Sequence, residues 1–401
     1  MTRVFIVGAK RTAIGNFGGS LSNVSASTLG GVAIEAALQQ STLAPQLVDE
    51  VIVGNVLSAG QGMGPARQAA LFADIPVEIP AYTLNMICGS GMKTVMDAAS
   101  KIKSGDASVV VAAGMESMSQ APYIVDAKNR FGAKMGHQSM KDSLINDGLT
   151  DAFNLYHMGV TAENIAAQYQ LSRLAQDEFA LRSQQRAIDA VSSGRFQDEI
   201  APIEVEQRRE TMSFFQDEYP RKKTTIESLS KLRPAFDKAG TVTAGNASGL
   251  NDGGVALVLA SDMAVKKHNL EPMAEVLAYG QGGVDPSVMG LGPVPAIKQA
   301  LQRANLNLDD IDLLELNEAF AAQALGVMHQ LTEQHNVDMP WFEDKTNVNG
   351  GAIALGHPLG ASGGRVLTTL LYEMIKQDKK LGLASLCIGG GMGTAVILKR
   401  V

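Results

Sequence analysis

The two ends of the chain carry similar segments, and this internal repeat limits the possible folds more than any other feature of the sequence. Leu43–Gly54 aligns without gaps to Leu306–Asn317, with apolar residues and an Asp at the same positions. Farther along, Ser108–Met115 resembles Ser385–Met392. Chance similarity between two βα units is the alternative. Two repeated units, each burying one face of its sheet against the other, explain both matches better.

Short apolar segments bounded by glycine alternate with segments of helical periodicity along most of the chain. This alternation favours an α/β architecture, and 401 residues suggest two or three domains at about 150 residues each. Strands are expected at 4–7, 51–57, 109–113, 255–260, 273–279, 313–316, 383–388 and 395–398. Helices are expected at 28–40, 173–191, 294–303, 318–333 and 361–376.

One segment interrupts the first repeat. Residues 120–246 show little strand character and contain a long polar helix from Arg173 and a charged run, Gln207–Pro234. The seven basic residues of this run, against four acids, are Arg208, Arg209, Arg221, Lys222, Lys223, Lys231 and Arg233. A phosphate-facing patch and a merely solvated surface both fit this surplus. We predict an N-terminal core half from 1–119 with 247–270, an inserted loop domain at 120–246 that covers the site, and a C-terminal core half at 271–401.

Bulk composition argues against several classes of function. With 45% hydrophobic and 19% charged residues, the chain has the composition of a globular protein. A net charge of -7 argues against a nucleic-acid coat protein, and no apolar run reaches the roughly 20 residues of a membrane span. The start lacks the apolar core of a signal peptide, and Lys399–Val401 is not a peroxisomal address. We expect a cytoplasmic protein that binds neither nucleic acid nor membrane.

Cys88 is one of only two cysteines, which are too few for a four-cysteine zinc site. It directly precedes an apolar pattern of helical spacing that runs to Ile102. Gly89 and Gly91 allow backbone N–H groups to approach a ligand at this helix start. Such a position should lower the pKa of the thiol toward neutral or below. A small buried hydrophobe is the alternative interpretation, but the glycine-flanked setting favours a nucleophile.

His357 lies in the glycine-rich segment Asn349–Gly364 and directly precedes Pro358. A residue before proline is extended, and proline suits the first turn of a helix. The imidazole is therefore expected at a second helix start, at the repeat position that roughly mirrors Cys88. Most single histidines are ordinary polar side chains, but this position indicates a base that activates the nucleophile.

Two further segments end predicted strands with polar groups. Cys387 is followed by the turn Gly389–Gly391, whose backbone N–H groups could approach a substrate oxygen as an oxyanion hole requires. Asn317 begins the segment Asn-Glu-Ala-Phe and could offer its amide to the same cleft. Each motif alone is a weak to moderate indication.

Taken together, the motifs resemble those of the thiolase family. The four that match in order and spacing are Asn85–Gly91, Asn317–Phe320, Gly356–Pro358 and Cys387–Gly393. Matches outside them are Tyr156–Gly159 and Thr243–Gly249, and the likeness runs from Val7 to the C-terminus. The resemblance implies a five-layered αβαβα core built from two repeated halves, with an inserted loop domain. It also implies a reversible Claisen condensation of two acetyl-CoA to acetoacetyl-CoA and CoA through a cysteine acyl-enzyme.

The resemblance assigns a role to each catalytic group. Cys88 becomes acylated, His357 is the base that activates it, and Cys387 exchanges the proton on the α-carbon. Asn317 positions a water that forms one oxyanion hole with His357, and the backbone N–H groups of Cys88 and Gly389 form the other. No metal or dissociable cofactor is implied, because CoA is itself a substrate.

Contacts with CoA and the acyl group are implied in the same way. Ser248 touches the pantetheine arm, and Arg221 lies where thiolases meet the nucleotide phosphates. The residues expected along the acyl pocket and the substrate are His157, Met158, Ala319 and Phe320. Tyr156–Gly159, Cys88–Gly91 and the triple glycine after Cys387 resemble short-chain rather than broad-chain members. A homotetramer, as a dimer of dimers that uses the segment near Ala121–Gln138, is also implied.

Three other classes of function are less consistent with the sequence. Gly360–Gly364 fits the Gly-x-Ser-x-Gly elbow of α/β-hydrolases, but that fold needs a later histidine and none follows His357. A phosphate-binding loop motif is absent, and no dinucleotide fingerprint follows a strand. A non-catalytic acyl-CoA-binding relative would have lost a catalytic residue, and all four are present.

Overall fold

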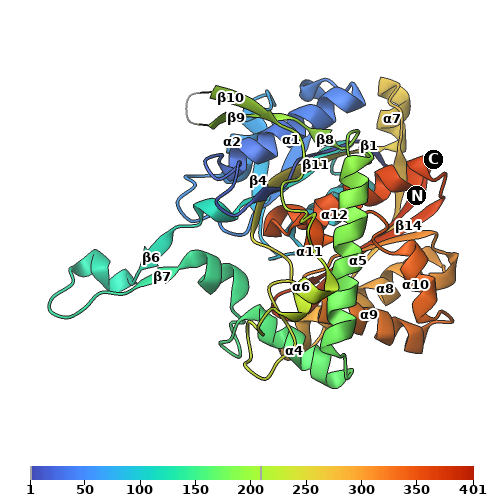
Figure 1. Ribbon diagram of the computed structural model, residues 1–401. Helices are drawn as coiled ribbons and strands as arrows, with labels where there is room; N and C mark the ends of the chain where they lie inside the picture. Colours follow the sequence, from blue (N-terminus) through green and yellow to red (C-terminus); the bar gives the residue numbers. More distant parts are fainter. Residues whose placement is uncertain (1, 208–209) are drawn as a thin grey trace.

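A computed structural model describes residues 2–207 and 210–401 of the chain. Its principal sheet has the strand order β13-β14-β15-β12-β1-β11-β5-β3-β4 (Figure 1). The N-terminal strands are β1 (Val4–Thr12), β3 (Glu50–Gly54), β4 (Ala81–Leu84), β5 (Val109–Ser117) and β11 (Asn251–Ser261). The C-terminal strands are β12 (Ala274–Gly283), β13 (Leu313–Leu316), β14 (Leu381–Ile388) and β15 (Met392–Arg400). Two short strands, β2 (Gly15–Asn16) and β8 (Ile200–Ala201), pair with β11 and β1.

The two halves of the sheet repeat one pattern of pairing. In the N-terminal half, β3 runs parallel to β5, and β5, β11 and β1 follow as antiparallel neighbours. In the C-terminal half, β13 runs parallel to β14, and β14, β15 and β12 follow in the same antiparallel way. The halves join where β1 and β12 pair, over two residue pairs, Phe5 with Glu275 and Ile6 with Ala274.

The aspartate at the shared position of the two aligned segments makes the same pair of hydrogen bonds in both halves. The Asp49 carboxylate accepts hydrogen bonds from the backbone N–H groups of 108 and 109 at 2.7 and 2.9 Å, where β5 begins. The Asp312 carboxylate accepts from the N–H groups of 380 and 381, both at 2.9 Å, where β14 begins. Each aspartate thus fixes the start of the strand that runs parallel to its own.

Three layers of helices alternate with the two sheet halves, which makes five layers in all. Those of the core are α1 (Ala26–Ser41), α2 (Pro65–Phe72), α3 (Ser90–Ser104), α8 (Pro293–Ala304), α9 (Ala321–Gln334) and α12 (Leu359–Lys376). One apolar core joins α1 and α2 to the outer face of the N-terminal half, and another joins α8 and α9 to the outer face of the C-terminal half. Between the halves, α3 and α12 share a third core with both inner faces. The predicted αβαβα fold is confirmed.

Burial on both faces explains the near-continuous apolar strands. On β11, Val255, Leu257 and Leu259 face the central helices, whereas Ala256 and Val258 face α1. The other helices are α4 (Met158–Gln168), α5 (Arg173–Ser192), α6 (Ile226–Ser230), α7 (Asp262–His268), α10 (Met339–Lys345) and α11 (Ala352–Leu355). Every strand and helix range expected from the sequence overlaps an observed element, but the expected strand 51–57 ends at Gly54 and the expected helix 318–333 begins only at Ala321.

The inserted segment contains more strand than the sequence suggested. Two antiparallel hairpins, β6 (Tyr123–Val125) with β7 (Met140–Asp142) and β9 (Ile203–Gln207) with β10 (Glu210–Phe214), correct that expectation. All four strands are only three to five residues long. β6 and β7 do not alternate apolar with polar residues, whereas β9 and β10 do, within the charged part of the insertion. The first hairpin forms an arm that projects from the molecule (Figure 1). Arg208 and Arg209 of the basic run lie outside the described residues, and the predicted domain boundaries remain a prediction.

A buried ion-pair cluster fixes the insertion to the core. The Arg11 guanidinium on β1 binds the carboxylates of Glu199 at 2.6 Å and Asp217 at 2.7 Å, and all three side chains are buried.

Among the described residues, no helix has the length and apolar character of a membrane span. Nor does this part of the chain contain a group of three or more His, Cys, Asp or Glu placed to hold a metal ion.

The central helices touch through their backbones where both begin. A Cβ on Gly91 of α3 would lie 2.7 Å from the carbonyl oxygen of Gly360, and one on Gly363 of α12 would lie 2.3 Å from the backbone N of Met92. The two helix starts, and with them the segments that carry Cys88 and His357, are therefore held side by side.

Gly363→Ala should destabilise the protein by about 1–3 kcal/mol, the usual cost of overpacking, because its new methyl group meets backbone that cannot rotate away. Gly283→Ala is the matched control, since its Cβ would meet only the Gly391 carbonyl oxygen at 3.7 Å. Denaturant unfolding of both variants tests the contact. Equal stability of the two variants would mean that the central helices are not packed backbone to backbone.

Candidate active site

Cys88 is held by a tight turn directly before α3, with Gly89 as the helix N-cap. The preceding Ile87 has a φ of +47°, a left-handed conformation that is strained for a β-branched residue. The Ser90 hydroxyl fastens the turn by donating to the Ile87 carbonyl at 2.6 Å. The backbone N–H groups of Gly389 and of Cys88 itself face the thiol sulfur. Two backbone donors therefore converge at the Cys88 sulfur.

The electrostatics of Cys88 differ from the sequence-based expectation. Burial of the thiol raises its pKa to about 11, although the two backbone N–H groups act in the opposite direction. The residue is only partly exposed. Removal of water from around the sulfur therefore outweighs the stabilisation by the helix start, and the expected low pKa was wrong.

His357 is fixed at both its backbone and its ring. Its backbone N–H donates to the Asn251 side-chain oxygen at 2.9 Å, and its Nδ1 lies 2.5 Å from the Ser362 hydroxyl. The Ser362 hydroxyl donates its hydrogen to the Pro358 carbonyl at 2.8 Å, so it accepts from Nδ1–H. This arrangement sets the tautomer and leaves the lone pair on Nε2. Nε2 is buried and has no hydrogen-bond partner in the described part of the chain.

The His357 ring is neutral. Burial, followed by the charge of Arg365, lowers its pKa to about 3. A neutral imidazole with an available Nε2 lone pair can accept a proton from a thiol at neutral pH.

Cys387 and Asn317 lie at the ends of the parallel strands β14 and β13. The Cys387 thiol is fully buried, and burial followed by the charge of the Cys88 sulfur raises its pKa. The Asn317 N–H donates to the Ser385 carbonyl at 3.0 Å, while both polar atoms of its buried side chain lack partners among the described residues. An unpartnered buried amide costs free energy, which marks a site for a polar ligand or water.

The four catalytic candidates meet at the junction of the two halves. Cys387 is electrostatically coupled to Cys88, and a Cβ on Gly89 would lie 2.2 Å from the Ile388 side chain. His357 precedes the helix whose first turn packs against the start of α3. Cys88, Cys387 and Gly389 therefore lie together, the segment that carries His357 lies beside them, and Asn317 follows β13, the strand that pairs with β14.

An aromatic slot adjoins this region. His157 stacks on Phe236 with ring centroids 4.5 Å apart, and Phe320 meets Phe236 edge-on at 6.0 Å. Beside it, the Ser248 N–H donates to the Ala319 carbonyl at 2.9 Å. Burial lowers the pKa of His157, so its ring is a neutral surface.

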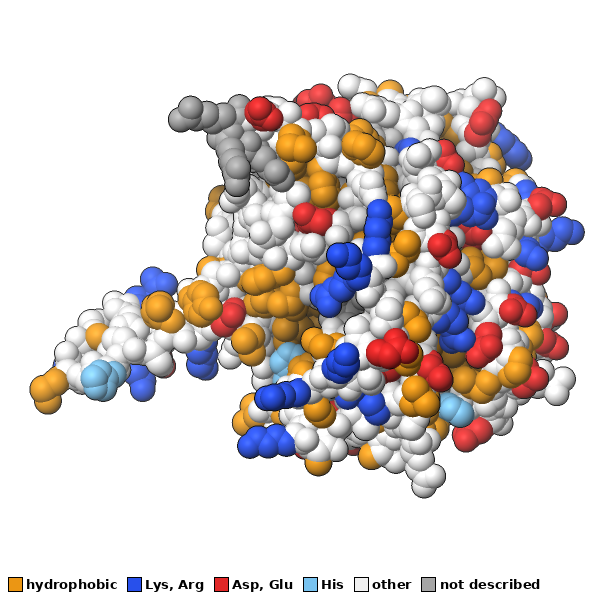
Figure 2. Space-filling view, in the orientation of Figure 1, with side chains coloured by type: hydrophobic (Ala, Val, Ile, Leu, Met, Phe, Trp, Pro, Cys, Tyr) orange, Lys and Arg blue, Asp and Glu red, His pale blue; other side chains and the backbone are white. Residues whose placement is uncertain are grey.

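A pocket of about 260 Å³ lies farther out, beside the insertion. The exposed Arg221 borders it, with its guanidinium 5.1 Å from the centre of the Tyr219 ring. Its further lining residues include Lys223, Ser228, Leu232, Ala244 and Gly245. Figure 2 shows Lys and Arg side chains gathered on the face that α5 and α6 cross. A phosphate-bearing ligand fits this combination of charge and depth.

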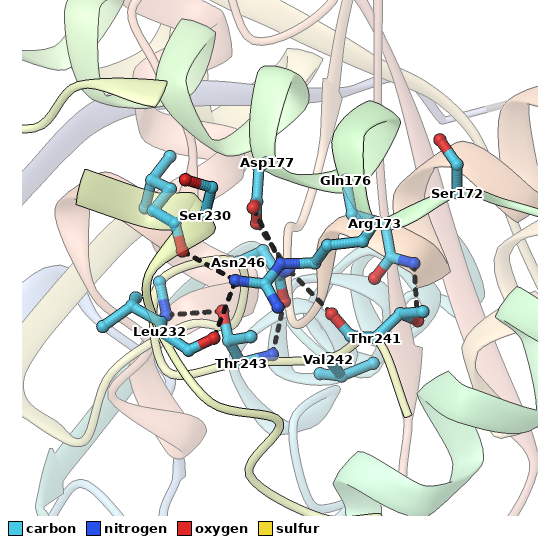
Figure 3. A network of polar contacts seen from close by, with 12 residues as sticks. Ser172, Arg173, Gln176, Asp177, Ser230, Leu232, Thr241, Val242, Thr243 and Asn246 are labelled. Carbon is cyan, nitrogen blue, oxygen red and sulfur yellow. Dashed lines mark hydrogen bonds and ion pairs between the residues drawn. The ribbon is translucent and has the colours of Figure 1, made fainter. Parts of the chain in front are cut away.

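A network from α5 holds the walls of this outer pocket (Figure 3). The Arg173 guanidinium binds Asp177 at 2.7 Å and donates to the Leu229 and Leu232 carbonyls at 2.6 and 3.0 Å. Asp177 also accepts from the Asn246 amide at 2.9 Å. The α6 segment and the loop that leads to Ser248 are thereby anchored to one helix.

A second pocket, of about 440 Å³, opens beside the nucleophile turn. Its lining includes Ile87, Phe153, Met158, Gly389 and Gly390. Met158, predicted at the acyl pocket, therefore borders open space next to the Cys88 turn.

Several residues of the site were not anticipated. Phe236, which forms the aromatic slot, follows the basic run and has no periodic signal. Ser362 and Asn251, which fix His357, are single polar residues in glycine-rich segments. Of the three, only Ser362 could have been found, because it lies five residues after His357, at the second residue of the helix expected at 361–376.

Comparisons with known proteins agree with this geometry. Two family models match: the thiolase N-terminal domain over residues 4–263 and the thiolase C-terminal domain over residues 270–400. The acetyl-CoA acetyltransferases of Cupriavidus necator and Escherichia coli are 54% and 52% identical over 401 residues, covering 100% of each chain. Human mitochondrial 3-ketoacyl-CoA thiolase in complex with CoA matches with a TM-score of 0.93 and 48% identity, covering 100% of this chain and 98% of that one. The chain belongs to the thiolase family.

Iodoacetamide should label Cys88 of the free protein before Cys387, because burial leaves Cys387 both less accessible and less acidic. The labelling rate should rise about tenfold per pH unit up to a pKa of about 11, since only the thiolate reacts. Peptide mapping across a pH series measures both, with Cys88→Ala as the unlabelled control. A plateau near the ordinary thiol pKa of about 8.5, or an adduct first on Cys387, would contradict the electrostatics described above.

Proposed function

We propose that this thiolase is an acetyl-CoA C-acetyltransferase, which condenses two acetyl-CoA to acetoacetyl-CoA and CoA and catalyses thiolysis in reverse. One observation carries the proposal: two thiols, a neutral imidazole and an unpartnered amide meet in a buried site. The relatives named acetyl-CoA acetyltransferase, 52–54% identical along the full chain, support it. The chain is an acyltransferase, and the roles of its residues follow as part of the proposal.

In the first half-reaction, the Cys88 sulfur attacks the carbonyl carbon of acetyl-CoA. Its proton passes to His357 Nε2 as the S–C bond forms, which avoids a free thiolate in a site that disfavours one. The backbone N–H groups of Cys88 and Gly389 stabilise the oxyanion. The CoA sulfur then leaves with the proton from His357, and the acetyl group remains on Cys88.

In the second half-reaction, Cys387 removes a proton from the methyl carbon of a second acetyl-CoA. Cys387 does so as a thiolate, because its own proton first passes to His357 Nε2, which becomes an imidazolium ion. A water held by Asn317, together with His357, stabilises the enolate oxygen. The enolate carbon attacks the acetyl group, acetoacetyl-CoA forms, and Cys88 leaves as a thiolate that takes a proton from the His357 imidazolium. Both thiols and the neutral imidazole are thereby restored.

CoA would occupy the aromatic slot and the outer pocket. The pantetheine arm would pass Ser248 and the stacked His157, while Arg221 would meet the nucleotide phosphates. The apolar faces of Met158, Ala319 and Phe320 would border the acyl and thioester groups. We propose that no metal or dissociable cofactor takes part, because each step moves only a proton or an acyl group between the chain and CoA.

Broad-chain thiolysis is a second candidate. The pocket of about 440 Å³ beside Met158 offers space for a longer acyl chain, and human 3-ketoacyl-CoA thiolase is 48% identical. Rates over a series of 3-ketoacyl-CoA chain lengths separate the two candidates. A sharp fall beyond the acetoacetyl group supports the acetoacetyl preference, and a sustained rate supports the alternative.

We also propose a homotetramer, as a dimer of dimers. The edge strand β4 would pair across a two-fold axis, and the arm near Ala121–Gln138 would join two dimers. The arm exposes large apolar side chains, including Phe131 at 87% and Met135 at 100%, which favours contact with another chain. Sedimentation at micromolar concentration tests the assembly, and a monomer would contradict it.

We propose a cytoplasmic location as well. Both cysteines are free, and the mechanism needs two thiols. A reducing compartment keeps them in that state.

Cys387→Ser should separate the half-reactions. Cys88, its helix start and His357 remain, so the variant should still take an acetyl group from acetyl-CoA. Turnover should fall by about 10²–10⁴-fold, because a serine hydroxyl is far too weak an acid to share the α-proton. Single-turnover labelling and steady-state rates measure the two quantities, with Cys88→Ala as the control that should lose both. Turnover of Cys387→Ser near the wild-type rate would exclude the two-cysteine mechanism.

A further inference from the structure

Glu116 ends β5 as a fully buried carboxylate that no step above uses. Its two oxygens accept four hydrogen bonds. Oε1 accepts from Asn55 Nδ2 at 2.9 Å and Leu57 N at 3.1 Å, and Oε2 accepts from Gly360 N at 2.8 Å and Val56 N at 3.1 Å. A carboxylate with four donors is held in one orientation, so the groups that donate to it are held as well.

The four donors come from both halves of the molecule. Residues 55–57 follow β3 of the N-terminal half, and the Asn85 amide at the head of the nucleophile turn donates to the Val56 carbonyl at 3.4 Å. Gly360 lies in the first turn of α12, three residues after His357. Glu116 therefore connects the segment beside the nucleophile to the segment that carries the base.

The Glu116 charge also acts on the site. It raises the pKa of the Cys88 thiol. Burial, opposed by the backbone N–H donors and assisted by the charge of the neighbouring Asp252 on β11, raises the pKa of Glu116 itself to about 7. The other groups that face this region are His357, with a pKa of about 3, and Arg365 on α12, which lowers that pKa. Cys88, with a pKa of about 11, and His357 do not change charge near neutral pH, whereas Glu116 does.

We infer that Glu116 is a positioning residue of the thiolase reaction, whose ionised carboxylate holds the first turn of α12, and through it His357, in place beside Cys88. The inference rests on the roles proposed for Cys88 and His357. Each Glu116 oxygen accepts two N–H groups. If one oxygen is protonated, or is replaced by an NH₂ group, it becomes a donor that faces two other donors. The hydrogen bonds on that side of Glu116 are then lost.

Glu116→Gln tests the inference by its effect on acetylation of Cys88 from acetyl-CoA, measured by rapid quench. The rate should fall by about 10- to 100-fold at pH 8, the range expected for loss of a hydrogen bond to a charged group. The acetyl-CoA concentration at half-saturation should stay within about twofold, because the CoA contacts are untouched. The wild-type rate should fall below about pH 7 as Glu116 is protonated, and the variant should lack this acid limb.

Asp49→Asn is the matched control. It also removes a carboxylate that accepts two backbone N–H groups on β5, but at the opposite end of the strand. Its thermal midpoint should fall while its acetylation rate and pH profile stay those of the wild type. Asn55→Ala, which removes one donor and leaves the carboxylate, should move the acid limb to higher pH even if Glu116→Gln does not fold.

The possible outcomes distinguish failure of the inference about Glu116 from failure of the roles proposed for Cys88 and His357. If the wild type takes no acetyl group on Cys88, the proposed roles are wrong whatever Glu116 does. If the wild type is acetylated and Glu116→Gln matches it in rate and acid limb, Glu116 does not position the base. A rate loss in Glu116→Gln equal to that of Asp49→Asn at the same loss of stability would also overturn the inference.

Discussion

The backbones of α3 and α12 touch where both helices begin, and the active site exists because of that contact. Gly91 and Gly363 have no side chain to keep the helices apart, so the segments before them, with Cys88 and His357, are brought together. Each helix belongs to a different repeat and packs on the inner face of both sheet halves. Neither repeat alone holds both Cys88 and His357. The proposed catalysis therefore requires both repeats together. Glu116 lies between them, where it can fix the position of α12 relative to the segment beside Cys88.

Burial gives the site its electrostatic character. It raises the pKa values of Cys88 and Cys387 and lowers that of His357, so each group tends to be neutral before substrate binds. In the proposed mechanism, charge develops only as bonds form, and the backbone N–H groups of Cys88 and Gly389 and the Asn317 amide stabilise it. Preorganised donors in a site with little water are the strongest means of stabilising an oxyanion or enolate. The strained turn at Ile87 and the unpartnered Asn317 side chain are costs in the folded protein that such a site explains.

Much of this organisation could be predicted from the sequence. The gapless alignment of Leu43–Gly54 with Leu306–Asn317 anticipated the repeated sheet halves, and glycines beside Cys88 and His357 indicated helix starts with exposed N–H groups. These signals are local, so one sequence shows them. The pKa of Cys88 was wrong because it depends on how much of the surrounding protein excludes water, which no local pattern records. Phe236 and Asn251 were missed for a similar reason, since their importance comes from partners more than 70 residues away.

Other features can be seen in the sequence, but their significance depends on contacts that only the fold creates. Glu116 interrupts an otherwise apolar strand, which is the usual sign of a buried acid with a special partner. Its partners come from residues 55–57 and from Gly360, which only the fold brings together. Strands β6 and β7 were missed because three residues carry too few alternations to stand out, whereas β9 and β10 do alternate but lie in a charged segment that was interpreted as lacking strands.

Cross-linking of the two cysteines by 1,3-dibromoacetone tests the convergence of the two repeats most directly. The reagent joins two thiols through a three-carbon bridge, so it reports whether Cys88 and Cys387 lie within a few ångströms of each other in the native protein. Once it is tethered to Cys88, its second carbon is at high effective concentration for a neighbouring thiol, even a buried one at alkaline pH. We expect one bridge per chain, found as a linked peptide pair after digestion, with only a single adduct in Cys387→Ser. Separate single adducts on the wild-type protein would show that the two thiols do not share one site.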